Sequence, residues 1–173
     1  MSRAFTKEEA PSDPVFVPPR PPLPPGATNY VTPRGLALLR AEQAELDAER
    51  TRLHEQGEGD ETKRQRAVVA GRLADLAARL ASARVLDPST QPPDEVRFGA
   101  TVALQTSDGE ERRFTIVGVD EAATAPDRVA FFAPIARAVV GKRVGDVVTL
   151  RTPRGEESLT VTAITYEAGD EPG

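Results

Sequence analysis

The chain has 173 residues, enough for one domain with an appendage or for two small domains. Its formal net charge of -5 indicates a soluble protein and argues against binding duplex DNA by bulk electrostatics. The absence of cysteine excludes disulfides and thiolate sites, and a single histidine excludes a histidine-based zinc site. No apolar run has membrane-spanning length and the N-terminus lacks a signal-peptide core, so we expect a cytoplasmic protein without a membrane partner.

Residues 1–28 form a proline-rich tail that contains the run PPRPPLPP from Pro18 to Pro25. Such a run cannot form a helix or a central strand, so we predict an extended polyproline-type segment, either mobile or laid along a surface. Two interpretations stay open. The composition favours a spacer without a function of its own, and the alternative is a proline-rich ligand for a partner.

Residues 29–87 predict a helical hairpin. Thr32 and Pro33 open the first helix, because threonine caps a helix and proline fits its first position. We expect this helix to run to about Glu55, where the glycine-broken turn at 57–62 begins. The second helix is predicted to start with a capping box between Thr62 and Gln65 and to end near Leu86, just before Asp87-Pro88.

Both predicted helices carry apolar residues at alternating steps of three and four, which keeps one stripe of each helix facing a partner. A short turn between two such helices makes them antiparallel. We therefore predict an antiparallel coiled coil with a single seam. The seam positions are Leu36, Leu39, Gln43, Leu46, Arg50 and Leu53 in the first helix and Val69, Leu73, Leu76, Leu80 and Ala83 in the second.

The turn places four acidic residues, Glu55, Glu58, Asp60 and Glu61, at the far tip of the hairpin. Acids at a helix start are stabilised by the helix dipole, by about 0.3–1 kcal/mol each. This structural role accounts for the last three acids but not for Glu55, which ends a helix. A functional interpretation is that the tip delivers carboxylates into the active site of another molecule.

After a linker at residues 88–95, the sequence period changes from three or four to two. Residues 96–167 predict a small, mostly antiparallel α+β unit with one short helix, and residues 168–173 form a tail. The expected strands are 101–105, 113–117, 128–132, 147–150 and 159–164, and the expected helix is 134–140. The fold class is thus α+β, with a helical hairpin followed by a β-sheet domain.

Five motifs between residues 29 and 166 resemble the bacterial Gre transcript-cleavage factor family. The motifs are Asn29–Gly35, Ile116–Glu121, Pro134–Ala138, Val144–Val147 and Thr152–Glu156. The resemblance implies an FKBP-like C-terminal domain that docks at the rim of the RNA polymerase secondary channel. It also implies a coiled coil that enters the channel, where tip carboxylates help the polymerase to cleave its own backtracked transcript.

By this resemblance Glu58, Asp60 and Glu61 are the catalytic tip carboxylates. Glu58 and Glu61 would hold a magnesium ion jointly with the polymerase, a role that suits hard oxygen ligands. The chain would be a monomeric accessory factor rather than an enzyme, with no cofactor of its own. Its partners would be core RNA polymerase and the 3′ end of the nascent RNA.

Three residues of the C-terminal motifs are candidates for contacting the polymerase: Asp120, Glu121 and Arg137. For Asp120 and Glu121, a simple turn is an equally good interpretation. Near the tip, His54 is expected to end a helix in solvent. The basic residues Lys63, Arg64 and Arg66 would either touch RNA phosphates or form a solvated face.

The tip also departs from the family pattern, since Glu58 replaces an aspartate and the usual asparagine and tyrosine are missing. Each helix is shorter than expected for the family by roughly one heptad, which retracts the tip by ~10 Å. One alternative is therefore a regulator that occupies the channel without cleavage, like a Gre-type inhibitor or the regulator of nucleoside diphosphate kinase. A prolyl isomerase is a remote second alternative, suggested by fold alone.

Overall fold

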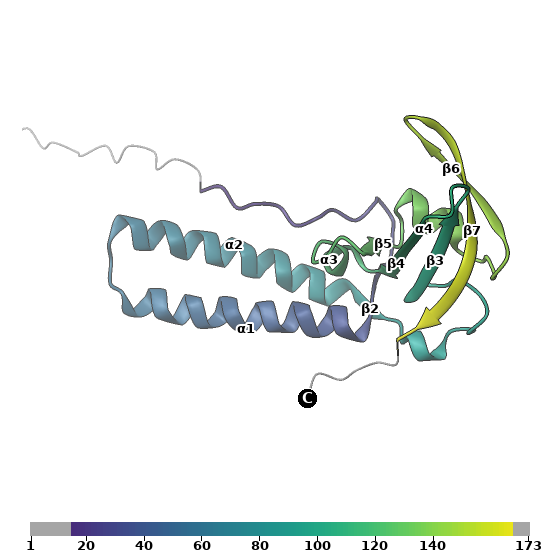
Figure 1. Ribbon diagram of the computed structural model, residues 1–173. Helices are drawn as coiled ribbons and strands as arrows, with labels where there is room; N and C mark the ends of the chain where they lie inside the picture. Colours follow the sequence, from purple (N-terminus) through teal and green to yellow (C-terminus); the bar gives the residue numbers. More distant parts are fainter. Residues whose placement is uncertain (1–14, 168–173) are drawn as a thin grey trace, which may run out of the picture.

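The computed structural model describes residues 15–167 and has two parts (Figure 1). A long hairpin of helices α1 (Pro33–Glu55) and α2 (Asp60–Ser82) lies at one end. A curled five-stranded sheet lies at the other end. The α+β class and the order of the two parts are as predicted. No helix of residues 15–167 is long and apolar enough to cross a membrane.

The predicted start of α1 is confirmed. Thr32 is the N-cap, its hydroxyl accepts a hydrogen bond from the Gly35 N–H at 2.9 Å, and proline occupies the first turn. The apolar stripes also meet as expected, since Leu39, Leu46 and Leu76 are buried against one another. Arg50 is the exception. It was placed in the seam, but it is exposed and pairs with Asp47 one turn away at 2.9 Å.

The predicted start of α2 is wrong by three residues. The helix begins at Asp60 with Gly59 as its N-cap, so Thr62 lies within the first turn and forms no capping box. Gln65, the other residue of the predicted capping box, does not bond to Thr62. Its side-chain amide donates to the carboxylate of Glu61 at 3.2 Å. Two acids in the first turn stabilise this earlier start through the helix dipole.

The end of α2 also differs from the prediction. The helix stops at Ser82, and Ala83–Val85 form strand β2, which pairs in parallel with β1 (Asn29–Val31). The side-chain amide of Asn29 donates to the Arg79 carbonyl at 3.0 Å and so satisfies one of the free carbonyls at the helix end. This helix end is therefore determined by a residue about 50 positions away.

The C-terminal sheet has the strand order β5-β4-β3-β7-β6. Three of its strand pairs are antiparallel, but β4 and β5 are parallel, so the sheet is mixed rather than antiparallel throughout. The strands run slightly longer or shorter than predicted. Their bounds are β3 Ala100–Thr106, β4 Glu111–Val117, β5 Arg128–Ala130, β6 Val147–Thr152 and β7 Gly155–Tyr166.

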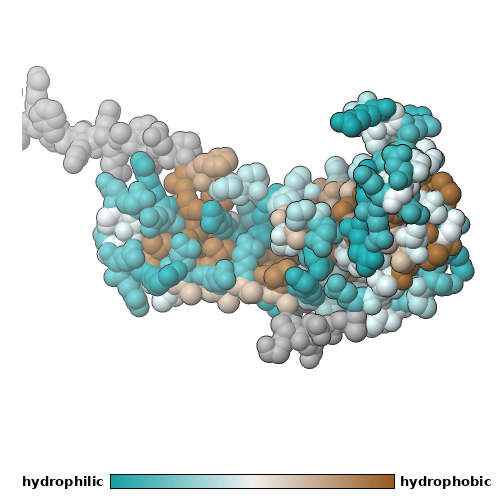
Figure 2. All heavy atoms as spheres, in the orientation of Figure 1, coloured by the Kyte–Doolittle hydropathy of each residue, from teal (hydrophilic) through white to brown (hydrophobic). Residues whose placement is uncertain are grey.

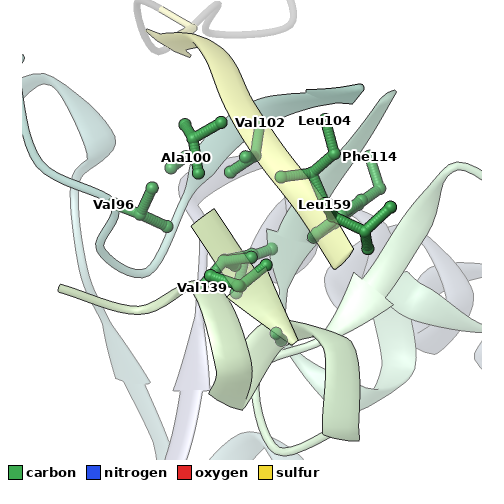
Figure 3. Packing of buried hydrophobic residues seen from close by; sticks show 11 residues of the cluster. Val96, Ala100, Val102, Leu104, Phe114, Val139 and Leu159 are labelled. Atoms are coloured by element: carbon green, nitrogen blue, oxygen red, sulfur yellow. The ribbon is translucent and has the colours of Figure 1, made fainter. Parts of the chain in front are cut away.

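Two short helices accompany the sheet, although only one was predicted. Helix α4 (Pro134–Val139) is the expected one, and it buries Ala136 and Val139 in the core of the sheet. Figure 3 shows Val139 of α4 opposite core residues of the strands, among them Leu104 and Leu159. The missed helix, α3 (Val119–Ala122), has only four residues, too few to give a helical period in the sequence.

The linker between the two parts is partly ordered against the sheet domain. Pro88–Thr90 form a short 3-10 helix, and Pro88 is buried beside Gly99. Further along, the Tyr166 hydroxyl at the end of β7 donates to the carbonyl of Glu95 and accepts from the Arg97 N–H at 2.9 Å. These contacts tie both ends of the sheet domain together.

Residues 15–26 of the proline-rich tail lie along the hairpin, and we call them the proline strap (Figure 1). Val17 packs so closely on α2 that a Cβ at Gly71 would lie 2.8 Å from its side chain. The Pro21 carbonyl accepts a hydrogen bond from Arg79 at 2.7 Å. The strap thus follows the second of the two predicted behaviours, an extended segment laid along a surface. Residues 1–14 and the 168–173 tail lie outside the described residues.

Candidate functional site at the hairpin tip

The hairpin tip is a short, tightly built turn. Gln56 caps the C-terminus of α1, and Gly57 follows with a φ of +89°, the left-handed conformation that glycine adopts without strain. Gly59 is then the N-cap of α2. The side chains of Glu58, Asp60 and Glu61 are all exposed, and Figure 2 shows mostly hydrophilic residues at this end of the hairpin.

Arg66 holds the turn together from α2. Its guanidinium donates to the carbonyl oxygens of Leu53, at 3.1 and 2.8 Å, and of Gly57, at 2.8 Å. A longer bond reaches the His54 carbonyl at 3.4 Å. The Leu53 carbonyl otherwise accepts only a long bond from the Gln56 N–H, at 3.4 Å. Arg66 therefore supplies donors to carbonyls at the C-terminal end of α1, where a cation also matches the helix dipole. Arg66 also lies 3.8 Å from the carboxylate of Glu58.

The sequence placed Arg66 among three basic residues that could contact RNA, but its donors are engaged inside the tip. Lys63 and Arg64 are exposed, and so is His54. The structural role of Arg66 has a signal in the sequence. Once the turn is placed at 57–59, an arginine six to seven residues into α2 comes level with the end of α1, which is where a capping cation is favoured.

The tip carboxylates do not form a preassembled metal site. Within residues 15–167, no group of three or more histidine, cysteine, aspartate or glutamate side chains is arranged to hold a metal ion. The chemistry of the donors nevertheless suits magnesium, which binds one or two protein carboxylates and takes its other ligands from substrate and water. The tip therefore offers ligands that a second molecule would have to complete.

Arg137 lies in a separate, apolar part of the surface. It lines an open hollow of 490 Å³ together with the aromatic residues Tyr30, Phe98 and Phe131. The three rings pack edge to face or tilted, with centroids 5.6–6.0 Å apart. Phe98 and Phe131 are thus only partly used by the core, and the exposed side of Arg137 adds a positive charge to the hollow.

Asp120 and Glu121, the other two candidates for partner contacts, are engaged within the chain. The buried Glu121 accepts hydrogen bonds from the hydroxyl of Thr32 and from Arg128, the latter at 3.2 Å. Asp120 pairs with Arg20 at 3.0 Å and with Arg79 at 3.2 Å. Both acids therefore join α3 to the hairpin instead of facing outward, and we assign them no partner.

Known proteins with similar sequences give the family. The protein-family model with the description "Transcription elongation factor, GreA/GreB, C-term" matches residues 91–166 of the sequence. The transcription elongation factor GreB of Neisseria meningitidis serogroup B is 35% identical over 153 residues, which cover 80% of this chain and 94% of that protein. GreA of Phenylobacterium zucineum is 38% identical over 115 residues, which cover 66% of this chain and 73% of that protein.

Two solved structures are also similar. Gfh1 of Thermus aquaticus is 24% identical and covers 80% of this chain and 99% of its own length, with a TM-score of 0.39. A GreA/GreB factor of Nitrosomonas europaea is 22% identical and covers 79% and 98%, with a TM-score of 0.41. The assignment depends on the sequence matches, which extend over nearly the whole length of a GreB. The chain belongs to the GreA/GreB family of transcription elongation factors.

Proposed function

We propose that this chain binds core RNA polymerase through residues 96–167, inserts its hairpin into the secondary channel and promotes cleavage of backtracked transcripts. The observation that carries the proposal is the tip itself. Three exposed carboxylates, those of Glu58, Asp60 and Glu61, stand at the end of a two-helix rod in a chain of the GreA/GreB family. Such a factor is not an enzyme by itself and works in the cytoplasm, where the polymerase is.

The carboxylates of Glu58 and Glu61 would hold a magnesium ion together with groups of the polymerase. A metal ion held by these residues and the polymerase would supply stabilisation of the attacking oxygen in phosphoryl-transfer chemistry. Asp60 lies between them in the sequence and adds negative charge beside the pair. The contribution of the chain is to place these oxygens, and Arg66 limits how far the turn can move while it does so.

The hollow around Arg137 is the surface that best fits docking on the polymerase. Partly exposed aromatic side chains with an arginine at their edge are the residue types enriched at protein interfaces. We expect Arg137→Glu to weaken binding to core polymerase about tenfold, because it reverses the charge at this surface. Unchanged binding of this variant would place the docking surface elsewhere.

The length of the hairpin favours a second function, occupation of the channel without cleavage. Each helix has 23 residues, so the rod extends about 35 Å from its base. Catalytic groups lose much of their effect when misplaced by about 1 Å. A tip that stops short of the polymerase metals would block the channel and leave the transcript intact.

A cleavage assay on a stalled, backtracked elongation complex separates the two functions. The wild-type chain should shorten the RNA, and replacing Glu58, Asp60 and Glu61 by alanine should lower the rate ~10²–10³-fold with polymerase binding retained. A matched control removes three acids from the middle of the hairpin, Glu45, Glu49 and Asp75. If the wild-type chain binds but shortens no RNA even at high magnesium, it is a non-cleaving regulator of the channel.

A further inference from the structure

A ring of charged groups joins the proline strap, both helices of the hairpin and the sheet domain at one point. Arg20 of the strap forms a bidentate ion pair with Glu42 of α1, in which Nη1 and Nη2 donate to the two carboxylate oxygens at 2.7 and 2.9 Å. The same guanidinium contacts Asp120 of α3 through Nε, at 3.1 Å, and Nη2, at 3.0 Å. Arg79 of α2 approaches Asp120 from the other side at 3.2 Å and donates to the Pro21 carbonyl.

Three members of this ring are largely screened from solvent, whereas the side chain of Glu42 is 40% exposed. The exposed fraction of the side chain is 16% for Arg20, 12% for Arg79 and 10% for Asp120. Charge pairs in such partly desolvated positions are stronger and less weakened by salt than pairs on an open surface. Arg20 also uses its planar guanidinium to bind two carboxylates from different elements, which a lysine ammonium does with less geometric restraint.

A second contact lies at the start of α1. The Thr32 hydroxyl at the N-cap meets the buried carboxylate of Glu121, and the Tyr30 carbonyl packs against Gly118 so closely that a Cβ there would lie 2.5 Å away. This contact fixes where the hairpin is attached. The ring around Arg20 holds the hairpin at a second point, because Glu42 lies ten residues further along α1 than Thr32. Two separated attachments together oppose rotation of the hairpin.

A small rotation at the base has a large effect at the tip. Over a rod of about 35 Å, a swing of 10° moves the tip by about 6 Å. That displacement exceeds by several-fold the misplacement of about 1 Å that catalysis tolerates. The angle between hairpin and sheet domain therefore decides where the tip carboxylates lie when the sheet domain is docked.

We propose that Arg20 is a positioning residue: by binding Glu42 and Asp120 together, it locks the angle between the hairpin and the sheet domain. The proline strap is then an internal brace of this chain, and its prolines keep it extended between the two parts. The effect of this brace on cleavage rests on the function proposed above. The angular restraint itself does not depend on that function.

Distance measurements between two spin labels test the restraint directly. The chain has no cysteine, so labels can be attached to Lys63→Cys near the tip and Ser107→Cys in the β3–β4 turn without removing native thiols. We expect one narrow distance distribution in the full chain. Arg20→Ala should widen it by about 6 Å, the displacement of a 10° swing, and Arg20→Lys should give an intermediate width.

Two further variants make the result specific. Glu42→Gln removes the α1 partner of Arg20 while keeping the shape of the side chain, and it should widen the distribution like Arg20→Ala. Arg50→Ala is the control, because Arg50 is an exposed arginine of α1 whose one ion pair within residues 15–167 is with Asp47. This variant should leave the width of the distribution unchanged. A distribution for Arg20→Ala as narrow as that of the wild type overturns the proposal.

Transcript cleavage gives a second readout. Because the docking surface is untouched, Arg20→Ala should leave the concentration for half-maximal stimulation within about twofold. The maximal rate should fall by up to ~10²-fold. An unchanged maximal rate would show that the angle does not matter for the tip. If the wild-type chain cleaves nothing, the proposed function fails, while the spin-label result still decides the role of Arg20.

Discussion

Shortening Leu39 to alanine should destabilise the hairpin strongly. Leu39 is 2% exposed and packs in a small cluster with Val31, Leu46 and Leu76. Burial of a leucine is lost and a cavity remains, which together typically cost about 2–5 kcal/mol. The cluster is small and bordered by the half-buried Leu36, so it can relax in part, and we expect about 3 kcal/mol.

Helical circular dichroism during thermal and denaturant unfolding measures this loss, because α1 and α2 hold most of the helix described. For a chain of this size, 1 kcal/mol corresponds to about 2–4 °C, so Tm should fall by about 6–12 °C. The matched control is Leu38→Ala, which makes the same chemical change at the next residue, where the side chain is 39% exposed. If the two variants lose similar stability, the seam is not what holds the helices together.

Three other changes test separate parts of the structure. The hydrogen bond from Arg20 holds the pKa of the Glu42 carboxyl below its usual value, so its stabilisation is present above the unfolded pKa near 4.5 and is lost as pH falls through the lowered, folded value. The difference in stability between wild type and Glu42→Gln, measured by denaturant unfolding, should be largest above pH 4.5 and shrink as the pH falls below it. Gly118→Ala places a Cβ 2.5 Å from the Tyr30 carbonyl and should cost ~1–3 kcal/mol, so unaltered thermal unfolding would contradict this packing. Gly57→Ala forces a left-handed φ of +89° on alanine and should cost ~1–2 kcal/mol. Amide hydrogen exchange should become faster at the hairpin tip and stay unchanged in the sheet domain.

The sequence by itself determined the elements whose signals are local. The alternation of apolar residues by three and four positions predicted the two helices and most of their seam, and Thr32 with Pro33 predicted where α1 begins. The change to a period of two predicted the strands of the sheet and their turns. These patterns work because each records which face of an element is buried, and that depends on neighbours three or four positions away in a helix and two in a strand.

The tertiary structure decided the features that depend on distant residues. Helix α2 ends at Ser82 because Asn29 binds the last turn from another strand, whereas the local sequence would allow it to continue to Leu86. Asp120 and Glu121 were candidates for partner contacts or for a simple turn, but they bind Arg20 and Thr32, which lie about 90–100 residues earlier in the chain. Nothing in the sequence marked Arg20 as a residue that forms ion pairs, because it lies in a proline run that resembled a spacer. A charged side chain has no period, so only the folded chain shows which opposite charges it meets.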